Sequence, residues 1–341
     1  MGPPTAHHPQ NDEVNDQQRL PESAVRRQWL HRALTWPLAG LTGCASGPWP
    51  DVPAGAGSSS ARARLQECAD AHGLAAWRGL HDINIGHRSV WSAGTRQPQM
   101  AWAGAAYRAQ SQERLLPAAG LLAQQHQGQA GQQQVLRRQG APAAPARPAA
   151  PAAPAAPVGP DQPGTGDVTV WLNHARSADQ EVRAAAALQA DASLLLLAGP
   201  MALAGFAGPV NWGPPETLDG RRCDQLLLDR VPGLGFSPSD RLALFVDRDL
   251  GLLRRLHRSL DGLHSTAGTL VEVDFFDHFN QHGIWWPRRF AERLRQPVAD
   301  LQWRDARLTG LDVNRGYGPD DISGALFTGA AAAPARALPA G

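Results

Sequence analysis

Residues 239–256 read SDRLALFVDRDLGLLRRL, and residues 271–294 read VEVDFFDHFNQHGIWWPRRFAERL. Both stretches carry apolar residues at every second position, and alternate side chains of a strand point to the same face. The alternating apolar residues are Leu242, Leu244 and Val246 in the first stretch, and Val271, Val273 and Phe275 in the second. Each stretch therefore predicts strands of an antiparallel sheet that buries one of its faces.

Strand-like segments of this kind recur along most of the chain. In the C-terminal half, strands are expected at 222–230, 240–248, 252–261, 268–279, 284–294 and 300–313, with turn sequences such as Pro232-Gly233 between them. In the N-terminal half, shorter strands are expected at 83–86, 100–108, 113–116, 121–126, 132–138 and 168–172. Together these segments predict one large curved antiparallel sheet of about eleven strands.

Two helices are expected to cover this sheet. One begins near the capping residue Ser58 and runs to about Leu80, and the other spans 176–197, where Gly199-Pro200 ends it. The apolar stretch around the end of the second helix contains Gly-Pro and has Asp191 at its edge, so we expect no membrane span there. The predicted fold class is mainly β (α+β).

The two quoted stretches resemble two hairpins of the LolA-like family, which comprises periplasmic lipoprotein carriers, related outer-membrane receptors and a sensor domain for mislocalised lipoproteins. The similarity covers residues 58–315 loosely and 220–313 more closely. It implies a half-open β-barrel whose concave apolar face holds lipid or acyl chains. Two features depart from the family pattern: the proline-rich stretch 139–166, and Arg254 and Arg258 on an otherwise leucine-lined strand face.

The resemblance assigns ligand contacts to the alternating apolar positions. The expected cavity residues are Leu242, Leu244, Val246, Val271, Val273, Phe275 and Trp286. Burial of an acyl chain against such a surface contributes about 0.8 kcal/mol per methylene. Because Trp285 and Trp286 are adjacent in a strand, they point to opposite faces, and only one of them can line the cavity. For either tryptophan, packing in an ordinary core is the alternative role.

The N-terminal region predicts export and lipidation. Leu41-Thr42-Gly43-Cys44 has the form of a bacterial lipobox, in which the cysteine thiol is acylated and becomes the N-terminus after cleavage. The apolar run Ala33–Gly43 suits a signal core and is too short for a membrane span, which needs about 20 residues. Arg26 and Arg27 supply positive charge and fit either a twin-arginine or an ordinary secretory signal. A signal peptide is therefore expected at 25–44, with lipidation at Cys44.

Composition assigns the remaining segments. Residues 1–24 are polar and precede the signal, so we expect a non-native extension there, with translation starting at the signal. Residues 45–59 are rich in Gly and Pro and predict a flexible tether. Residues 60–315 are expected to form a single domain. Prolines at every third position of 139–166 predict a loop insertion with polyproline II character, and 316–341 is expected to be a disordered tail.

Charge and cysteine content narrow the classes of function. The chain has 32 basic residues, all of them Arg, against 31 acidic ones, and a formal net charge of +1. Such a balance provides no global field to attract nucleic acid, and we expect no nucleic-acid partner. If Cys44 is acylated, Cys68 and Cys223 remain, and they can form a disulfide in an oxidising periplasm or stay as two separate buried thiols.

Motifs of catalysis are not found in the sequence. It contains no G-x-S-x-G elbow, Walker loop, H-E-x-x-H or dinucleotide fingerprint. Asp277, His278 and His282 lie around a strand end and a turn, where solvated turn residues are expected rather than metal ligands. We therefore expect no enzyme, no cofactor and no metal.

The sequence favours a binding protein held at the membrane by acyl chains. Ala45 after the lipidated cysteine favours the periplasmic face of the outer membrane, because an Asp at that place commonly retains lipoproteins at the inner membrane. The expected ligand is lipid or the acyl chains of a lipidated protein. The alternative is an envelope scaffold or stress-sensor lipoprotein that binds a protein partner without lipid cargo.

Overall fold

The computed structural model describes residues 57–96, 102–139, 167–229, 240–261, 263–296 and 301–335. The export signal with Arg26, Arg27 and Cys44, nearly all of the tether, and residues 140–166 of the proline-rich insertion lie outside the described residues. The expectations for those segments stay predictions.

Thirteen strands of the described residues form one antiparallel sheet, and two short strands form a separate hairpin. The sheet contains β1 Ile83–Trp91, β2 Gln110–Leu116, β3 Leu121–Gly128, β4 Gly131–Arg138, β5 Asp167–Leu172, β6 Ala175–Arg176, β7 Val210–Leu218, β8 Arg221–Leu228, β9 Leu242–Asp247, β10 Leu253–Ser259, β11 Leu270–Phe276, β14 Arg289–Gln296 and β15 Leu301–Val313. The hairpin contains β12 Phe279–Gln281 and β13 Ile284–Trp286. The predicted large antiparallel sheet is confirmed.

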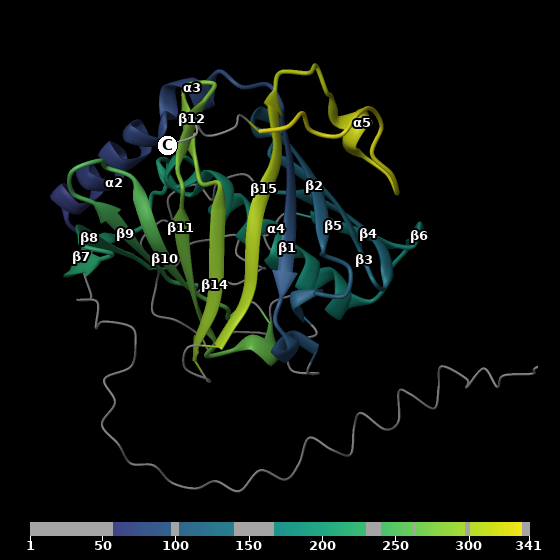
Figure 1. Cartoon of the computed structure of the whole chain (residues 1–341), viewed down its shortest axis with the longest axis horizontal. Helices are drawn as coiled ribbons and strands as arrows, with labels where there is room; N and C mark the ends of the chain where they lie inside the picture. Colours follow the sequence, from purple (N-terminus) through teal and green to yellow (C-terminus); the bar gives the residue numbers. More distant parts are fainter. Residues whose placement is uncertain are drawn as a thin grey trace, which may run out of the picture. The chain divides into compact units, whose positions relative to one another are not determined.

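The strand order shows that this sheet is open. It runs β6-β5-β4-β3-β2-β1-β15-β14-β11-β10-β9-β8-β7, so β1 pairs with β15 and the two halves of the sheet meet at its centre. The edge strands β6 and β7 are not neighbours, and the helix α4 Gln180–Leu203 connects them. The strands curve around α4, which occupies the concave side of this half-barrel (Figure 1).

The expected N-terminal helix is present but broken. α2 Ser59–His72 begins at Ser58, whose hydroxyl accepts a hydrogen bond from the backbone N–H of Ala61, and α3 Leu74–Arg78 follows. Gly73 separates the two helices with φ of 101°. A Cβ atom at Gly73 would lie only 2.2 Å from the carbonyl oxygen of Gly283 in the β12–β13 turn, so the break depends on glycine.

The regular part of the second helix ends close to the predicted position, but α4 as a whole continues beyond Gly199-Pro200. Ala198 departs from helical geometry (φ −130°, ψ 15°), and α4 kinks there and continues to Leu203. Because of the kink, Pro200 lies in the first turn of a new helical segment. A first-turn N–H has no partner within the helix, so the missing N–H of Pro200 is tolerated. α4 is long and apolar enough to cross a membrane, but 89% of its 18-residue apolar window is buried inside the protein, as in a core helix.

Three strand predictions need correction. Residues 102–108 form turns instead of the strand expected at 100–108, because Gly104 takes a positive φ of 62° and the backbone closes turns back onto it. The strand expected at 284–294 is divided at Pro287 into β13 and β14. β7 was not expected because it contains Pro214-Pro215, which an edge strand tolerates at the irregularity between Gly213 and Glu216.

The expected disordered tail is wrong for residues 316–335, which fold back onto the convex face of the sheet as a C-terminal strap. The carboxylate of Asp82 accepts hydrogen bonds from the backbone N–H groups of Arg315, Gly316 and Tyr317 and fixes the start of the strap. The strap contains α5 Pro319–Ile322 (yellow in Figure 1). The fully buried Ile322 packs there against apolar side chains of β2 and β3.

The core lies between the concave face of the sheet and the helices. Apolar residues of β8 to β11 pack with α2 and α4 in one cluster, and those of β1 to β5 pack with α3 and α4 in a second cluster. Cys68 in α2 and Cys223 in β8 are both buried and unpaired, so the two separate thiols are observed and the disulfide is not.

Candidate ligand site in the half-barrel interior

Six of the seven predicted cavity residues lie on the concave face, where side chains of the helices cover them, and Trp286 lies in the β12–β13 hairpin. These six belong to β9 and β11, and each of the seven is at most 4% exposed: Leu242, Leu244, Val246, Val271, Val273, Phe275 and Trp286. In the first core cluster the β9 and β11 residues pack with Leu188, Leu195 and Leu196 of α4. The apolar concave face is therefore present and filled, and contact of these residues with a ligand stays a prediction.

The two adjacent tryptophans lie on opposite faces, as the strand alternation requires. Trp286 is buried in the second cluster, with its ring centroid 6.4 Å from that of Trp77, and its Nε1–H donates to the carbonyl oxygen of Gln281. Trp285 is 37% exposed. Trp286 thus anchors the β12–β13 hairpin against α3, which is a packing role.

A buried charged band crosses the concave face between the two apolar clusters. We define the interior charged band as Arg108, Arg258, Arg304, Glu113 and Glu292. Glu292 accepts hydrogen bonds from Arg258 (3.0 Å) and Arg304 (2.8 Å), and all three side chains are almost fully buried. Burial favours the neutral acid, but the charges of Arg304 and Arg258 outweigh it, and the pKa of Glu292 is lowered. Glu292 is therefore a carboxylate held between two guanidinium groups.

The band continues toward α4 through His87. The Nε2 atom of His87 lies 3.3 Å from Arg304 Nη2 and 3.2 Å from Glu113 Oε1, and the hydroxyl of Ser193 in α4 donates to both oxygens of Glu113. Burial, together with the charges of Arg304 and Arg108, holds the pKa of His87 well below its usual value, so this imidazole is neutral. Burial raises the pKa of Glu113. The band thus has three guanidinium groups against one carboxylate and one weakened acid.

A pocket of about 110 Å³ opens between α4 and β3 to β5 and reaches this band. Its apolar walls are Trp102, Val135, Leu172, Val182, Ala185 and Ala186, and its polar residues include Arg108, Gln124, His126, Gln133 and Gln189. Arg108 Nη1 donates to Gln189 Oε1 at 2.6 Å. Burial and the charge of Arg304 lower the pKa of Arg108 to about 9, which leaves it cationic at neutral pH. The pocket therefore combines an apolar wall with a buried cation.

Several donors around the interior charged band have no partner among the described residues. They are Nε of Arg108, Nε and Nη1 of Arg258, and Nε1 of Trp303. The indole of Trp303 packs 5.1 Å from that of Trp102, a wall residue of the pocket. An unpaired buried donor costs about 1–3 kcal/mol, so this arrangement favours an anionic or acceptor group in the interior.

His278 and the arginines of β14 make packing and ion-pair contacts. No cluster of three or more potential metal ligands exists among the described residues, and the ring of His278 packs 5.9 Å from that of His72. On β14, Arg289 pairs with Asp305, and Arg293 pairs with Glu272 and Asp274. These arginines form ion pairs on the convex face rather than an open cationic patch.

The interior charged band was largely missed by sequence reasoning. Its one visible signal was Arg258, which shares a strand face with leucines and indeed lies inside, paired with Glu292. Arg254, the other flagged arginine, pairs with Asp247 instead. The face on which Arg108 lies could not be assigned from the sequence, because it follows a turn, and side chains do not alternate between two faces in a turn.

Among the comparisons with known proteins, the comparison with solved structures found similar chains. No family profile matches the sequence, and no curated protein matches it either. Solved structures with a similar outline include a DUF1329 family protein from Desulfovibrio piger, which is 11% identical with a TM-score of 0.46 over 78% of this chain and 98% of that chain.

Two further structures of this kind connect with the predicted resemblance. A LolA superfamily protein from Nitrosomonas europaea is 12% identical, with a TM-score of 0.41 over 77% of this chain and 97% of that one. A putative outer membrane lipoprotein-sorting protein domain from Vibrio parahaemolyticus is 11% identical, with a TM-score of 0.38 over 77% and 97%. The LolA superfamily, which the sequence resembles, is thus represented among the structures to which this chain is similar.

Proposed function

We propose that this chain is a lipid-anchored binding protein of the bacterial envelope that holds lipid, or the acyl chains of a lipidated protein, in its half-barrel interior. The observation that carries the proposal is the pocket between α4 and β3 to β5, where apolar walls meet the buried guanidinium of Arg108. An amphipathic anion matches this combination, because its charged end can pair with Arg108 while its apolar part contacts the walls.

The size of the pocket limits what it holds in the described conformation. Ligand pockets commonly measure about 300–1,000 Å³, and this one measures about 110 Å³. It admits a head group or the end of a chain. A whole acyl chain needs the leucines of α4 to move off β9 and β11, which would expose Leu242, Leu244, Val271 and Val273.

Export and anchoring complete the proposal. The signal at 25–44, with Arg26 and Arg27, directs the chain across the inner membrane, and acylated Cys44 holds it at the periplasmic face of the outer membrane. Two lipid signals already give stable attachment, so a fully acylated cysteine makes the anchor effectively permanent. The domain acts within reach of its tether as a binding protein, without catalysis or a cofactor.

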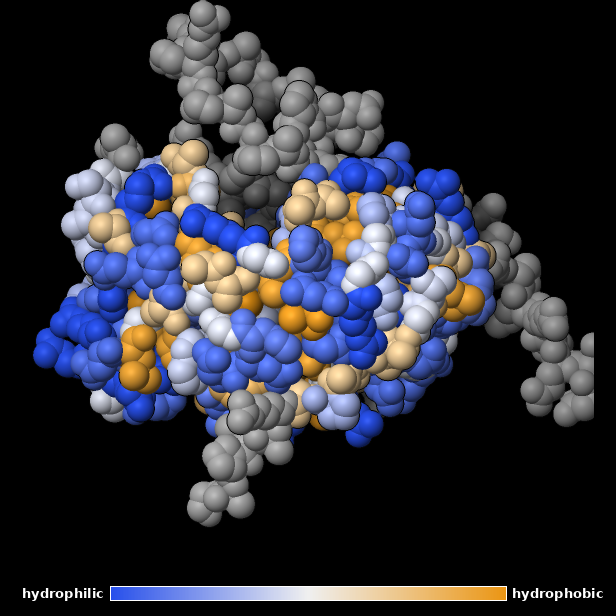
Figure 2. Space-filling view, turned by 90° about the horizontal axis from the view of Figure 1, so that it is seen from above, coloured by the Kyte–Doolittle hydropathy of each residue, from blue (hydrophilic) through white to orange (hydrophobic). Residues whose placement is uncertain are grey.

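One observation favours the alternative, an envelope scaffold or stress sensor that binds a protein partner. The concave face is filled by helix side chains, as in a protein that carries no lipid. However, the large exposed apolar residues of the described chain are scattered: Val90, Trp212, Leu250, Trp285 and Leu326. On the face shown in Figure 2, hydrophobic residues form small groups between hydrophilic ones rather than one large patch, which favours the lipid-binding proposal.

Native mass spectrometry with lipid extraction tests the proposal on residues 45–341 purified from a bacterial periplasm. We expect phospholipid or acyl chains to co-purify in stoichiometric amount. Ala185→Trp places a large side chain at the pocket wall and should reduce the bound lipid at least severalfold. Ala184→Trp is the matched control, because it adds the same bulk to the neighbouring residue of α4, which does not line the pocket.

Two outcomes would overturn the lipid proposal. The first is an empty domain that also fails to take up a fluorescent fatty acid, which would leave the protein-binding scaffold. The second is equal lipid content in the Ala185→Trp and Ala184→Trp variants, which would place any bound lipid outside this pocket.

A further inference from the structure

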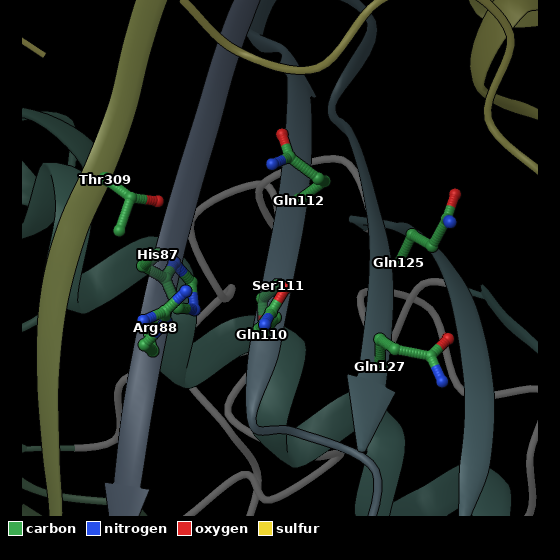
Figure 3. A pocket seen from close by; sticks show the side chains of 8 residues that line it. All are labelled: His87, Arg88, Gln110, Ser111, Gln112, Gln125, Gln127 and Thr309. Atoms are coloured by element: carbon green, nitrogen blue, oxygen red, sulfur yellow. The ribbon is translucent and has the colours of Figure 1, made fainter. Parts of the chain in front are cut away.

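A second pocket lies on the convex face of the sheet, opposite α4. It has a volume of about 330 Å³ and is formed by β15, β1, β2 and β3. The pocket is lined by Arg88, Gln110, Gln112, Gln125, Gln127 and Thr309. His87 and Ser111 also border it, but they are buried and bond to residues on the concave side of the sheet. We name it the amide groove. Figure 3 shows its side chains on these four neighbouring strands, with α4 behind the sheet.

The glutamines of the groove are in register across the strands. Gln110 of β2 is the antiparallel partner of Gln127 of β3, and Gln112 is the partner of Gln125. Cross-strand partners on one face have Cβ atoms about 4.5–5.5 Å apart, so these four amides form a compact two-by-two array. Each amide offers both donor and acceptor atoms, which is the chemistry that recognises hydroxyl groups.

The C-terminal strap orients two of these amides. The Oε1 atom of Gln125 accepts from the backbone N–H of Phe327 at 3.3 Å, and that of Gln112 accepts from the N–H of Ala332 at 3.1 Å. The strap thus engages the amide oxygens, and the amide NH₂ groups of Gln112 and Gln125 are left to donate into the groove. These NH₂ groups suit ligand oxygens.

A glycine keeps the floor of the groove open. Gly86 of β1 is the strand partner of Gln112, and the register of β1 and β15 shifts next to it. A Cβ atom at Gly86 would lie 3.0 Å from Gln112 Nε2 and 3.1 Å from Thr309 Oγ1. Any side chain at this position would therefore occupy the space between the glutamine and the threonine.

One end of the groove is cationic. Arg88 lines it, and the strand partner of Arg88 on β15 is Arg307, so two exposed arginines are adjacent. Within the described part of the chain neither has an acidic partner, whereas the nearby Arg289 pairs with Asp305. No aspartate or glutamate lines the groove. An anionic ligand group at this end is therefore not repelled by a carboxylate of the groove.

We propose that the amide groove binds an acidic saccharide, with the amides and Thr309 on the sugar hydroxyls and Arg88 on its carboxylate or phosphate. The absence of apolar lining residues argues against an acyl chain. The volume lies at the lower end of the range of ligand pockets, about 300–1,000 Å³, and suits one or two sugar rings. This site is separate from the lipid-binding proposal, because the sheet lies between the two pockets.

Isothermal titration calorimetry on the full chain in detergent micelles tests the site with four probes: digalacturonate, the neutral disaccharide lactose, inorganic phosphate and short-chain phosphatidylglycerol. We expect digalacturonate to bind, and lactose to bind at least about tenfold more weakly. Arg88→Gln should weaken digalacturonate binding by about tenfold or more, and Gly86→Val should abolish it. Arg138→Gln, which removes an exposed arginine of β4 outside the groove, should leave binding unchanged.

The proposal is overturned if digalacturonate does not bind, or if Arg88→Gln binds it as the unaltered chain does. It is also overturned if phosphate binds as tightly as digalacturonate, which would indicate an unspecific anion site. Tighter binding of phosphatidylglycerol, lost in Arg88→Gln, would assign the surface to membrane headgroups instead. If Gly86→Val does not fold by circular dichroism, Gln112→Leu takes its place. Lipid co-purification does not bear on any of these outcomes.

Discussion

At the scale of single residues, His72 shows how one imidazole joins distant segments. The backbone N–H of Leu253 in β10 donates to Nε2 of His72 at 2.9 Å, so Nε2 must be unprotonated. Nδ1 then carries the proton and donates to the carbonyl oxygen of Trp285 in β13 at 3.1 Å. Only the neutral ring can make both bonds, and burial lowers the pKa of His72 to about 4.

This geometry predicts acid sensitivity. The folded pKa of about 4 lies below the ordinary value of 6.5, so the stability contributed by neutral His72 is complete above pH 6.5 and is lost as the pH falls toward 4. Between pH 7 and pH 5 the loss from this residue is about 2 kcal/mol. Burial lowers the pKa of the neighbouring His278 to about 3, which acts in the same direction.

Urea unfolding at pH 7 and pH 5 measures this effect. His72→Gln should lose about 2 kcal/mol less than the unaltered chain between these two pH values. His264→Gln, at an exposed histidine, is the control and should keep the full pH dependence. An unchanged pH dependence in His72→Gln would show that the neutral ring is not the acid-sensitive group.

At the scale of elements, α4 is fixed to the sheet by polar contacts as well as by leucines. Arg137 of β4 donates from Nε and Nη2 to the two carboxylate oxygens of Asp191, both at 2.9 Å. Two further hydrogen bonds join α4 to the surrounding residues: Ser193 donates to Glu113, and Gln189 accepts from Arg108. Apolar packing alone would permit α4 to slide along the concave face, whereas these directional bonds fix its position.

Removal of this buried pair should be costly. Asp191→Ala leaves the buried guanidinium of Arg137 without its carboxylate, and we expect a loss of about 3–5 kcal/mol in the free energy of unfolding. The control is Asp167→Ala, which removes the exposed pair of Asp167 and Arg183, with atoms 3.6 Å apart, and should cost less than about 1 kcal/mol. Equal losses in urea unfolding of the two variants would contradict the assigned role of Asp191.

At the scale of the whole molecule, the predicted anchor defines where the domain works. Cys44→Ser removes the thiol that receives the lipid, so we expect the protein in the soluble periplasmic fraction or as unprocessed precursor. Detergent partitioning and mass spectrometry of the N-terminus measure this. Unchanged membrane partitioning together with unchanged cleavage would refute the lipoprotein assignment.

The architecture could be predicted where side-chain alternation carries the information. Leu242, Leu244 and Val246 were placed correctly on one buried face, because every second residue of a strand must share a face. The same rule failed at β7, where Pro214-Pro215 interrupts the pattern, and at residues 102–108, where turns replace it. The C-terminal strap was missed because a few buried contacts, such as Ile322, order a segment of low hydrophobicity.

The sequence by itself determined the large antiparallel sheet and its apolar face, and it predicts the lipobox at Cys44, since all three follow from local patterns. Only the tertiary structure decided what occupies the concave side. It placed α4 on the concave side of the sheet, covered the predicted cavity residues, and paired Arg258 and Arg304 with Glu292. The physical reason is that alternation assigns a side chain to a face, whereas its depth and its partners depend on segments far away in the chain.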